Sequence, residues 1–182
     1  REMAIDDPDI WLKATDNIGN IIDFVSELIN KGHAYPTSKG DVYFSVESFA
    51  PYGRLSHRNL EDALNGVRIE NDDEKKNPLG DEQKSFGEQI DIHGGGRDLI
   101  FPHHENEIAQ TEALTGKQFV KYWVHNGLIK VNGQKMSKSL GNSLLLSDLL
   151  KEYSNEAIKF ALLSTNYRND INITPDLFPE AE

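Results

Sequence analysis

The 182-residue sequence contains no cysteine. Disulfide bonds and thiolate metal ligands supplied by this chain are therefore excluded. Long apolar runs are missing too, because none approaches the roughly 20 residues that cross a membrane. The opening stretch REMAIDDPDIW also lacks the charged-then-apolar order of a signal peptide. We expect a cytoplasmic protein without a membrane partner.

Basic residues are scarce as well, since 19 lysines and arginines stand against 30 acidic residues and the formal net charge is -11. Such a surface does not attract a polyphosphate as a whole, so a nucleic-acid partner needs a local basic site. Hydrophobic residues make up 37% of the chain, which is enough for a buried core.

The first half of the chain predicts a helix and a strand. Apolar residues recur at helical spacing before Gly32, which suits a helix C-cap; they are Ile18, Ile21, Ile22, Val25, Leu28 and Ile29. The stretch GDVYFSV alternates apolar and polar residues, as a strand does. Residues 71–85 carry no periodicity and predict a surface loop or a junction.

The second half has the order of an α/β unit. A β-rich run, EQIDIHGGG, enters glycines and is followed by the helix-forming HHENEIAQTEALTG. The pair Asn132-Gly133 predicts a hairpin turn, which leads into a loop rich in lysine and serine. Two helices are expected after that loop, over 147–153 and 155–163.

Three motifs are candidates for chemistry. His103 and Glu107 lie four residues apart, so a helix would place them on one face, where both side chains could bind Zn²⁺. The alternative is a capping or core His103 beside solvated His104 and Glu105. Gly94, Gly95 and Gly96 after His93 would let a ligand approach the backbone, or would form a tight turn at positive φ with His93 as buried structure.

The third motif is QKMSKSLGN, which gathers lysines in an otherwise acidic chain. Its ammonium groups suit developing charge on phosphates, although a solvated loop is the usual explanation of such a run.

The motif Lys135-Met136-Ser137-Lys138-Ser139 is the complete KMSKS signature of the class I aminoacyl-tRNA synthetases. Together with DIHGGGRDLIFPHHENEIAQTEA and YWVHNGLIKVNGQKMSKSLGN, it makes the chain resemble the cysteinyl-tRNA synthetases. The resemblance extends from INKGHAYPTSKGDVYFSV to EAIKFALLSTNYRNDIN. The cysteine ligase of mycothiol synthesis is similar around the glycines and histidines, but the continuation ENEIAQ favours the synthetases.

This resemblance implies an α/β fold that is part of a Rossmann-type catalytic domain. We expect a connecting insertion and flanking helices over 1–85, the second half of the catalytic domain with the KMSKS loop over 86–145, and the start of a helical stem-contact region over 146–182. The implied activity is ATP-dependent ligation of cysteine to tRNA(Cys) through cysteinyl-adenylate. The family is usually monomeric, and ATP is used with Mg²⁺.

The resemblance also implies the roles of individual residues. His103 and Glu107 match zinc ligands, and His93 with Gly94, Gly95 and Gly96 matches the pocket for the substrate thiol. Lys135 and Lys138 are the expected catalytic residues, within an ATP-binding loop that consists of Lys135, Met136, Ser137, Lys138 and Ser139.

Parts of the family pattern are not in the sequence. The HIGH-type signature with one zinc cysteine would precede Arg1, and the anticodon-reading region would follow the chain. A stretch with the second zinc cysteine would lie between KKNPLG and KSFGEQ. Two of four zinc ligands therefore remain, and we do not expect the chain alone to hold zinc tightly or to be active.

Two other functions are compatible with the residues. A catalytically silent fragment or binding module would keep the synthetase fold and contact tRNA or a protein. A metal-dependent hydrolase built on HHENE would need a third ligand, which spacing does not identify.

Overall fold

The computed structural model describes residues 2–59, 87–137 and 140–182. The chain divides into two compact units, which are considered separately. The α4 unit comprises Trp11–His93 and Leu99–Val124, and the β5 unit comprises Arg1–Ile10, Gly94–Asp98 and His125–Glu182. The loop or junction predicted over 71–85 lies outside the described residues.

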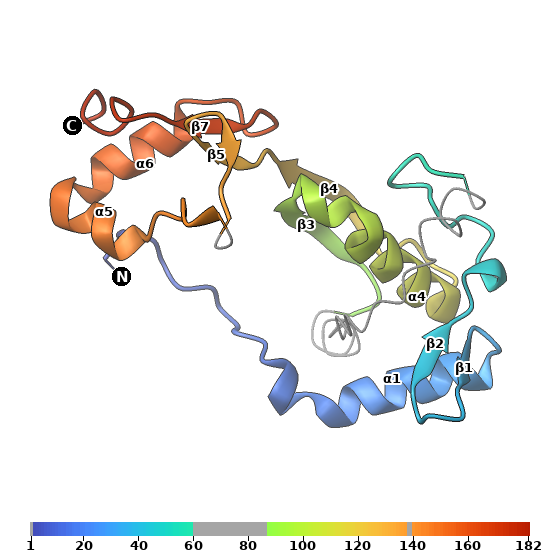
Figure 1. Ribbon diagram of the computed structural model, residues 1–182. Coiled ribbons are helices and arrows are strands. Elements are labelled where there is room, and N and C mark those ends of the chain that lie inside the picture. The colour runs from blue at the N-terminus through green and yellow to red at the C-terminus, as the bar shows by residue number, and fades with distance from the viewer. Residues whose placement is uncertain (1, 60–86, 138–139) are drawn as a thin grey trace. The chain divides into compact units, whose positions relative to one another are not determined.

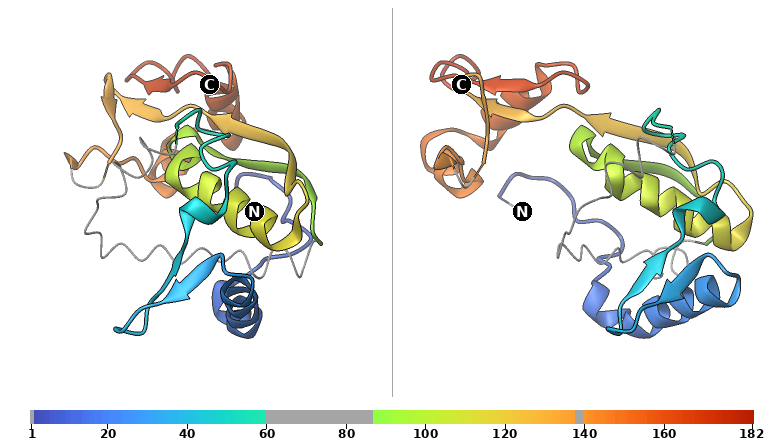
Figure 2. Two further views of the ribbon diagram at one scale, coloured as in Figure 1. Left: turned by 90° about the vertical axis from the view of Figure 1, so that its right-hand side faces the viewer. Right: turned by 45° about the vertical axis from the view of Figure 1, so that its right-hand side comes forward.

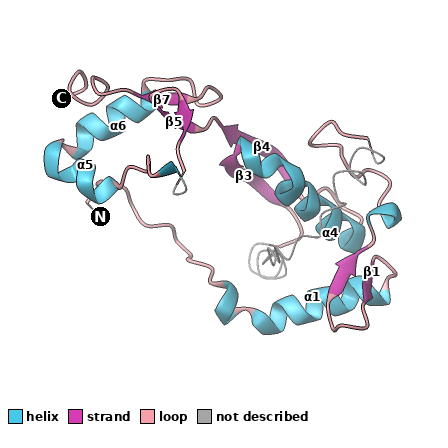
Figure 3. Ribbon diagram, viewed as in Figure 1, coloured by secondary structure: helices cyan, strands magenta, loops and turns pink. Residues whose placement is uncertain are grey.

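The α4 unit begins with a short 3-10 turn, Ala14–Asp16, and helix α1, Ile18–Asn30. The predicted cap is confirmed: Gly32 has a φ of 78°, and the N–H groups of Gly32 and His33 donate to carbonyls of the last helical turn. Strands β1 (Ala34–Pro36) and β2 (Val42–Phe44) then form an antiparallel pair (Figure 3). A second 3-10 turn, Val46–Ser48, replaces the end of the strand predicted over 40–46.

The apolar face of α1 differs from the prediction. Phe24 and Leu28 are buried and pack against Ala34 and Leu114, whereas Ile18 and Ile22 are 52% and 58% exposed. Periodicity locates an apolar stripe on a helix, but the elements packed against the helix decide which part of that stripe is covered.

Strand β3 (Ile90–Gly96) and helix α4 (Glu105–Thr115) follow in the predicted order. Strand β4 (Val120–Asn126), which the sequence pattern did not indicate, comes next. A 3-10 turn, Arg97–Leu99, and a π-helical turn, Ile100–His104, connect β3 to α4. Strands β3 and β4 are neighbours in one sheet, and α4 runs alongside them (Figures 1 and 2).

Buried side chains join these elements within the α4 unit. Ile108 and Ala109 of α4 pack in one cluster with Phe49 and Tyr52, and Trp123 of β4 lies against that cluster. Phe119, which has no exposed surface, is buried beside Val120 at the start of β4. Burial of large apolar side chains such as these contributes about 1.5–3 kcal/mol each and fixes α4 beside β4.

The β5 unit contains a small mixed sheet and two helices. Strand β5 (Ile129–Val131) pairs antiparallel with β6 (Gln134–Lys135) and parallel with β7 (Ile171–Ile173). The hairpin turn is confirmed, because Asn132 and Gly133 have φ values of 49° and 81°.

Helices α5 (Leu146–Glu152) and α6 (Asn155–Leu163) agree with the two predicted helices to within a residue. Ser154 caps α6 by accepting the N–H of Ala157. Ile158 and Ala161 of α6 are buried with Ile173 and Phe178. Among the described residues, no helix combines the length and the apolar character that a membrane span requires.

Candidate functional site

The candidate metal ligands His103 and Glu107 are in direct contact. Nε2 of His103 lies 3.1 Å from Oε1 of Glu107. The His103 side chain is 28% exposed, whereas that of Glu107 is only 4% exposed. His103 belongs to the π-helical turn that precedes α4, and the pair keeps the predicted four-residue spacing across the junction.

The local sequence explains this turn. Phe101 has extended dihedrals, φ −137° and ψ 132°, inside the Ile100–His104 segment. A residue that precedes proline avoids helical dihedrals because its backbone clashes with the proline ring, so Pro102 accounts for the break. Regular helix begins at Glu105, and the histidines are therefore presented at its N-terminal end.

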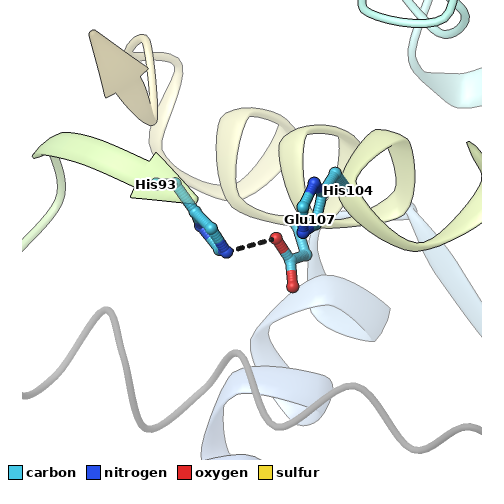
Figure 4. A group of neighbouring side chains, drawn as sticks. All are labelled: His93, His104 and Glu107. Carbon is cyan, nitrogen blue, oxygen red and sulfur yellow. Dashed lines mark ion pairs between the residues drawn. The ribbon is translucent and has the colours of Figure 1, made fainter. Parts of the chain in front are cut away.

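His93 reaches the same carboxylate from strand β3. Its Nε2 lies 3.5 Å from Oε2 of Glu107, as Figure 4 shows. The His93 ring stacks on Trp123 of β4, with ring centroids 4.7 Å apart and an interplanar angle of 23°. The carboxylate of Glu107 thus contacts two imidazoles, and the approach of strand β3 to helix α4, rather than sequence spacing, supplies the second.

The alternative interpretation of the motif expected His104 and Glu105 to be solvated, but both residues are buried. They are 1% and 0% exposed. The ring of His104 lies 4.8 Å from that of His93 and 4.9 Å from that of Trp123. Sequence reasoning did not include His104 in the site, although His93, His104 and Glu107 offer ligand atoms within 4.8 Å of one another.

Glu105 binds a segment far away in the sequence. Its Oε1 accepts the backbone N–H groups of Gly53 at 2.9 Å and Leu55 at 3.4 Å, and its Oε2 accepts that of Ser56 at 2.8 Å. Backbone donors of this kind stabilise a buried carboxylate, which would otherwise be costly to remove from water. Sequence reasoning missed this role, since nothing in the local spacing links Glu105 to residues 53–56.

Two further contacts hold the same segment on α4. The Tyr52 hydroxyl donates to Oδ1 of Asn106 at 2.6 Å, and Arg54 donates to both carboxylate oxygens of Glu112 at 2.9 and 3.0 Å. Burial raises the pKa of Tyr52 to about 12, with a further contribution from the charge of Glu105. These contacts attach the helix that carries Glu107 to the segment around Gly53.

The glycine stretch forms the end of β3 and not a turn. Gly94, Gly95 and Gly96 are strand residues, and none of the three is among the glycines with positive φ. The tight-turn alternative is therefore wrong. A Cβ at Gly96 would lie 2.6 Å from Oδ1 of Asp98, at the end of a side chain that can move aside. Their role as a substrate pocket stays a prediction.

Of the KMSKS signature, the structure describes Lys135, Met136 and Ser137. The Lys135 side chain is 61% exposed, and its Nζ lies 3.9 Å from Oδ2 of Asp98. The predicted residues Lys138 and Ser139 lie outside the described residues. The loop leaves the β5–β6 hairpin, whose register pairs Lys135 with Lys130.

Asp170 joins several elements of the β5 unit. Its carboxylate lies 2.6 Å from Nη2 of Arg97 and 2.8 Å from Nζ of Lys130, and it accepts the N–H of Leu128 at 2.9 Å. The hydrogen bond from Lys130, then that from Leu128, lowers the pKa of Asp170 to about 2. Asp170 therefore links Arg97, which follows the three glycines, to Lys130 of strand β5.

The donor atoms around Glu107 are compatible with zinc. Imidazole nitrogen and carboxylate oxygen are both Zn²⁺ ligands, and the buried carboxylate of Glu107 is flanked by His103 and His93. His103 and Glu107 would hold the metal through Nε2 and Oε1, the two atoms that face each other.

Comparison with known proteins identifies the family of the chain. A family model described as tRNA synthetases class I (C) catalytic domain matches residues 1–81 and 80–182. The two matches overlap at residues 80–81, where KKNPLG ends and the interval before KSFGEQ begins, and the resemblance implied an additional stretch in that interval.

Curated proteins named "Cysteine--tRNA ligase" are similar over nearly the whole chain. The protein from Pelobacter propionicus is 44% identical over 211 residues, which cover 99% of this chain and 43% of that protein. The protein from Bacillus cytotoxicus is 45% identical over 196 residues, with coverage of 91% and 42%. The chain thus spans less than half the length of these relatives.

A solved structure supports the fold. Mycobacterium tuberculosis methionyl-tRNA synthetase, in complex with methionyl-adenylate, matches 94% of this chain and 50% of that chain with a TM-score of 0.64 at 14% identity. The fold class expected from the sequence is confirmed, and the family match covers both halves of the chain. The chain belongs to the class I tRNA synthetase (C) catalytic domain family.

Proposed function

We propose that the protein containing this chain ligates cysteine to tRNA(Cys) and uses ATP with Mg²⁺. The observation that carries the proposal is the carboxylate of Glu107 between His103 and His93, at 3.1 and 3.5 Å, in a chain 44–45% identical to proteins named cysteine–tRNA ligase. A protein of this kind is expected to act as a monomer in the cytoplasm.

His103 and Glu107 would hold Zn²⁺ together with ligands outside this chain. Bound zinc would favour the thiolate of cysteine over the hydroxyl of serine, because thiolate is the better zinc ligand and a coordinating thiol loses its proton. His93 would contact the substrate beside this pair. Its stacking on Trp123 fixes the plane of the ring, so Nε2 is held toward Glu107.

Lys135 and Lys138 would act on the phosphates of ATP. A carboxylate oxygen of cysteine attacks the α-phosphorus, the bond to the bridging oxygen breaks, and pyrophosphate leaves. Positive charge near the departing oxygens stabilises the charge that develops there. A hydroxyl of tRNA then attacks the carbonyl carbon of the adenylate, and AMP leaves.

Cysteine-dependent ATP–pyrophosphate exchange tests the proposal in the complete protein. Lys138→Ala should lower exchange by about 100-fold, the order seen when a strong transition-state contact is lost. Lys117→Ala is a matched control, because Lys117 belongs to the α4 unit, where it pairs with Glu88, and is not part of the motif. Exchange that does not require cysteine would exclude the proposed substrate, and normal exchange in Lys138→Ala would exclude the role of that lysine.

The hydrolase alternative gains one observation, since His93 provides the third donor that spacing did not identify. Metal-dependent hydrolysis of an ester, reduced by His93→Ala and accompanied by no pyrophosphate exchange, would favour it. A catalytically silent module would show neither activity and would bind tRNA or a protein partner.

A further inference from the structure

Asn142 lies just beyond the KMSKS signature, at a position to which no role has yet been given. Its side-chain amide makes two hydrogen bonds back to the loop. Oδ1 accepts the backbone N–H of Ser137 at 2.8 Å, and Nδ2 donates to the carbonyl of Lys135 at 3.2 Å. One side chain therefore binds a donor and an acceptor of the loop at the same time.

The contacts around Asn142 fix the backbone on either side of Met136. The Met136 N–H donates to the Ile129 carbonyl at 3.1 Å, which continues the hairpin. Oγ of Ser137 accepts the N–H of Leu140 at 3.3 Å. Gly141, immediately before Asn142, has a φ of 65°, a conformation that glycine adopts readily and that belongs to the turn preceding the Asn142 amide.

These contacts leave the charged group accessible. The Lys135 side chain is 61% exposed, although its carbonyl is bound by Asn142 and its backbone pairs with Lys130. A cation on a fixed backbone loses less conformational entropy when it meets an anion than one on an unordered loop. The arrangement is thus suited to a phosphate-bearing ligand.

We infer that Asn142 is a positioning residue that holds Lys135 and Ser137 in the conformation that binds the phosphates of a nucleoside triphosphate. The inference rests on the proposed function of the loop. Asn142 acts through the backbone of these two residues and makes no contact with the reacting atoms.

The structure offers a matched control in the same hairpin. Oδ1 of Asn172 accepts the N–H of Gly133 at 2.7 Å, so Asn172→Ala removes a bond of the same type from the turn and leaves the loop contacts in place. Asn142→Asp retains an acceptor for the Ser137 N–H and removes the donor to Lys135. Asn142→Ala removes both.

Two measurements on the complete protein that contains this chain test the inference. Amide hydrogen exchange followed by NMR reports whether the Ser137 N–H is protected, and isothermal titration with Mg-ATP gives its Kd. Asn142→Ala should speed Ser137 exchange and raise the Kd about three- to tenfold, as expected for the loss of one or two modest hydrogen bonds. Asn172→Ala should change neither value, and Asn142→Asp should keep Ser137 protected.

The outcomes separate the inference from the proposed function. If the unaltered complete protein does not bind Mg-ATP, the phosphate-binding role of the loop fails, and the inference fails with it. If the complete protein binds Mg-ATP and Asn142→Ala leaves the Kd unchanged, or leaves Ser137 protected, the inference alone is overturned. An equal rise in Kd for Asn142→Ala and Asn172→Ala would also overturn it, because general loosening of the hairpin would then explain the effect.

Discussion

Oε1 of Glu105 accepts the backbone N–H of Gly53 at 2.9 Å, across 52 residues of sequence. The other oxygen of the same carboxylate accepts the N–H of Ser56 at 2.8 Å. Glu105 has no exposed surface, so these donors replace the water that its charge would otherwise bind. The helix that carries the candidate zinc ligand Glu107 is thereby attached to the segment around Gly53.

The first prediction concerns this attachment. Glu105→Gln should lower the free energy of unfolding by about 1–3 kcal/mol, because an amide has only one acceptor oxygen and must face at least one buried donor with its NH₂ group. Urea denaturation followed by circular dichroism measures the change. Glu180→Gln, at an exposed position, should have little effect, and an equal loss in both variants would contradict the role assigned to Glu105.

The second prediction concerns Tyr52, whose pKa is raised to about 12 by burial and by Glu105. The ordinary value is 10.0, so the neutral form stabilises the fold fully below pH 10 and this contribution is lost as pH rises toward 12. Absorbance titration of tyrosinate should show one late transition among the 6 tyrosines. That transition should be missing in Tyr52→Phe and should move to lower pH in Glu105→Gln.

The third prediction concerns the loss of folding stability at low pH. The folded-state pKa of Asp170 is about 2, below its ordinary value of 3.8. The ionised carboxylate therefore stabilises the fold above about pH 4, and this contribution disappears as pH falls toward 2. Asp170→Asn should flatten the decline in thermal stability across that interval.

A surface carboxylate provides the control for Asp170. Asp148 is 60% exposed and pairs with Lys151 in the same helix, an interaction that is worth little in water. Asp148→Asn should retain the decline of the unaltered chain. If the thermal stability of Asp170→Asn fell with pH in parallel with that of the unaltered chain, the ion pairs of Asp170 with Arg97 and Lys130 would not contribute to stability at low pH.

The fourth prediction uses two glycines with opposite surroundings. A Cβ at Gly127 would lie 2.0 Å from the carbonyl oxygen of Asn169, whereas a Cβ at Gly19 would meet nothing within 4 Å. Gly127→Ala should destabilise the chain by about 1–3 kcal/mol through overpacking against backbone. Gly19→Ala, in helix α1, should stabilise it by up to about 1 kcal/mol. Chemical denaturation of both variants measures the free energy of unfolding, which should fall for Gly127→Ala and rise for Gly19→Ala.

Much of the local structure could be predicted because it depends on neighbouring residues. The Asn132-Gly133 pair favours positive φ at both positions and so determined the hairpin turn. Gly32 ended α1 for the same reason, and the four-residue spacing of His103 and Glu107 gave their contact. The KMSKS signature and the HHENE motif identified the family from residue types alone, as the family match confirms.

Tertiary structure decided the relationships that join distant segments. Packing against Ala34 and Leu114 selected Phe24 and Leu28 as the buried face of α1. Pairing of β3 with β4 brought His93 to Trp123, and the position of α4 beside β3 brought His93 to Glu107. Folding of the segment around Gly53 onto α4 buried Glu105. Periodicity and motif spacing describe positions along one element, whereas these contacts depend on which elements bury each other's surface and satisfy each other's hydrogen bonds.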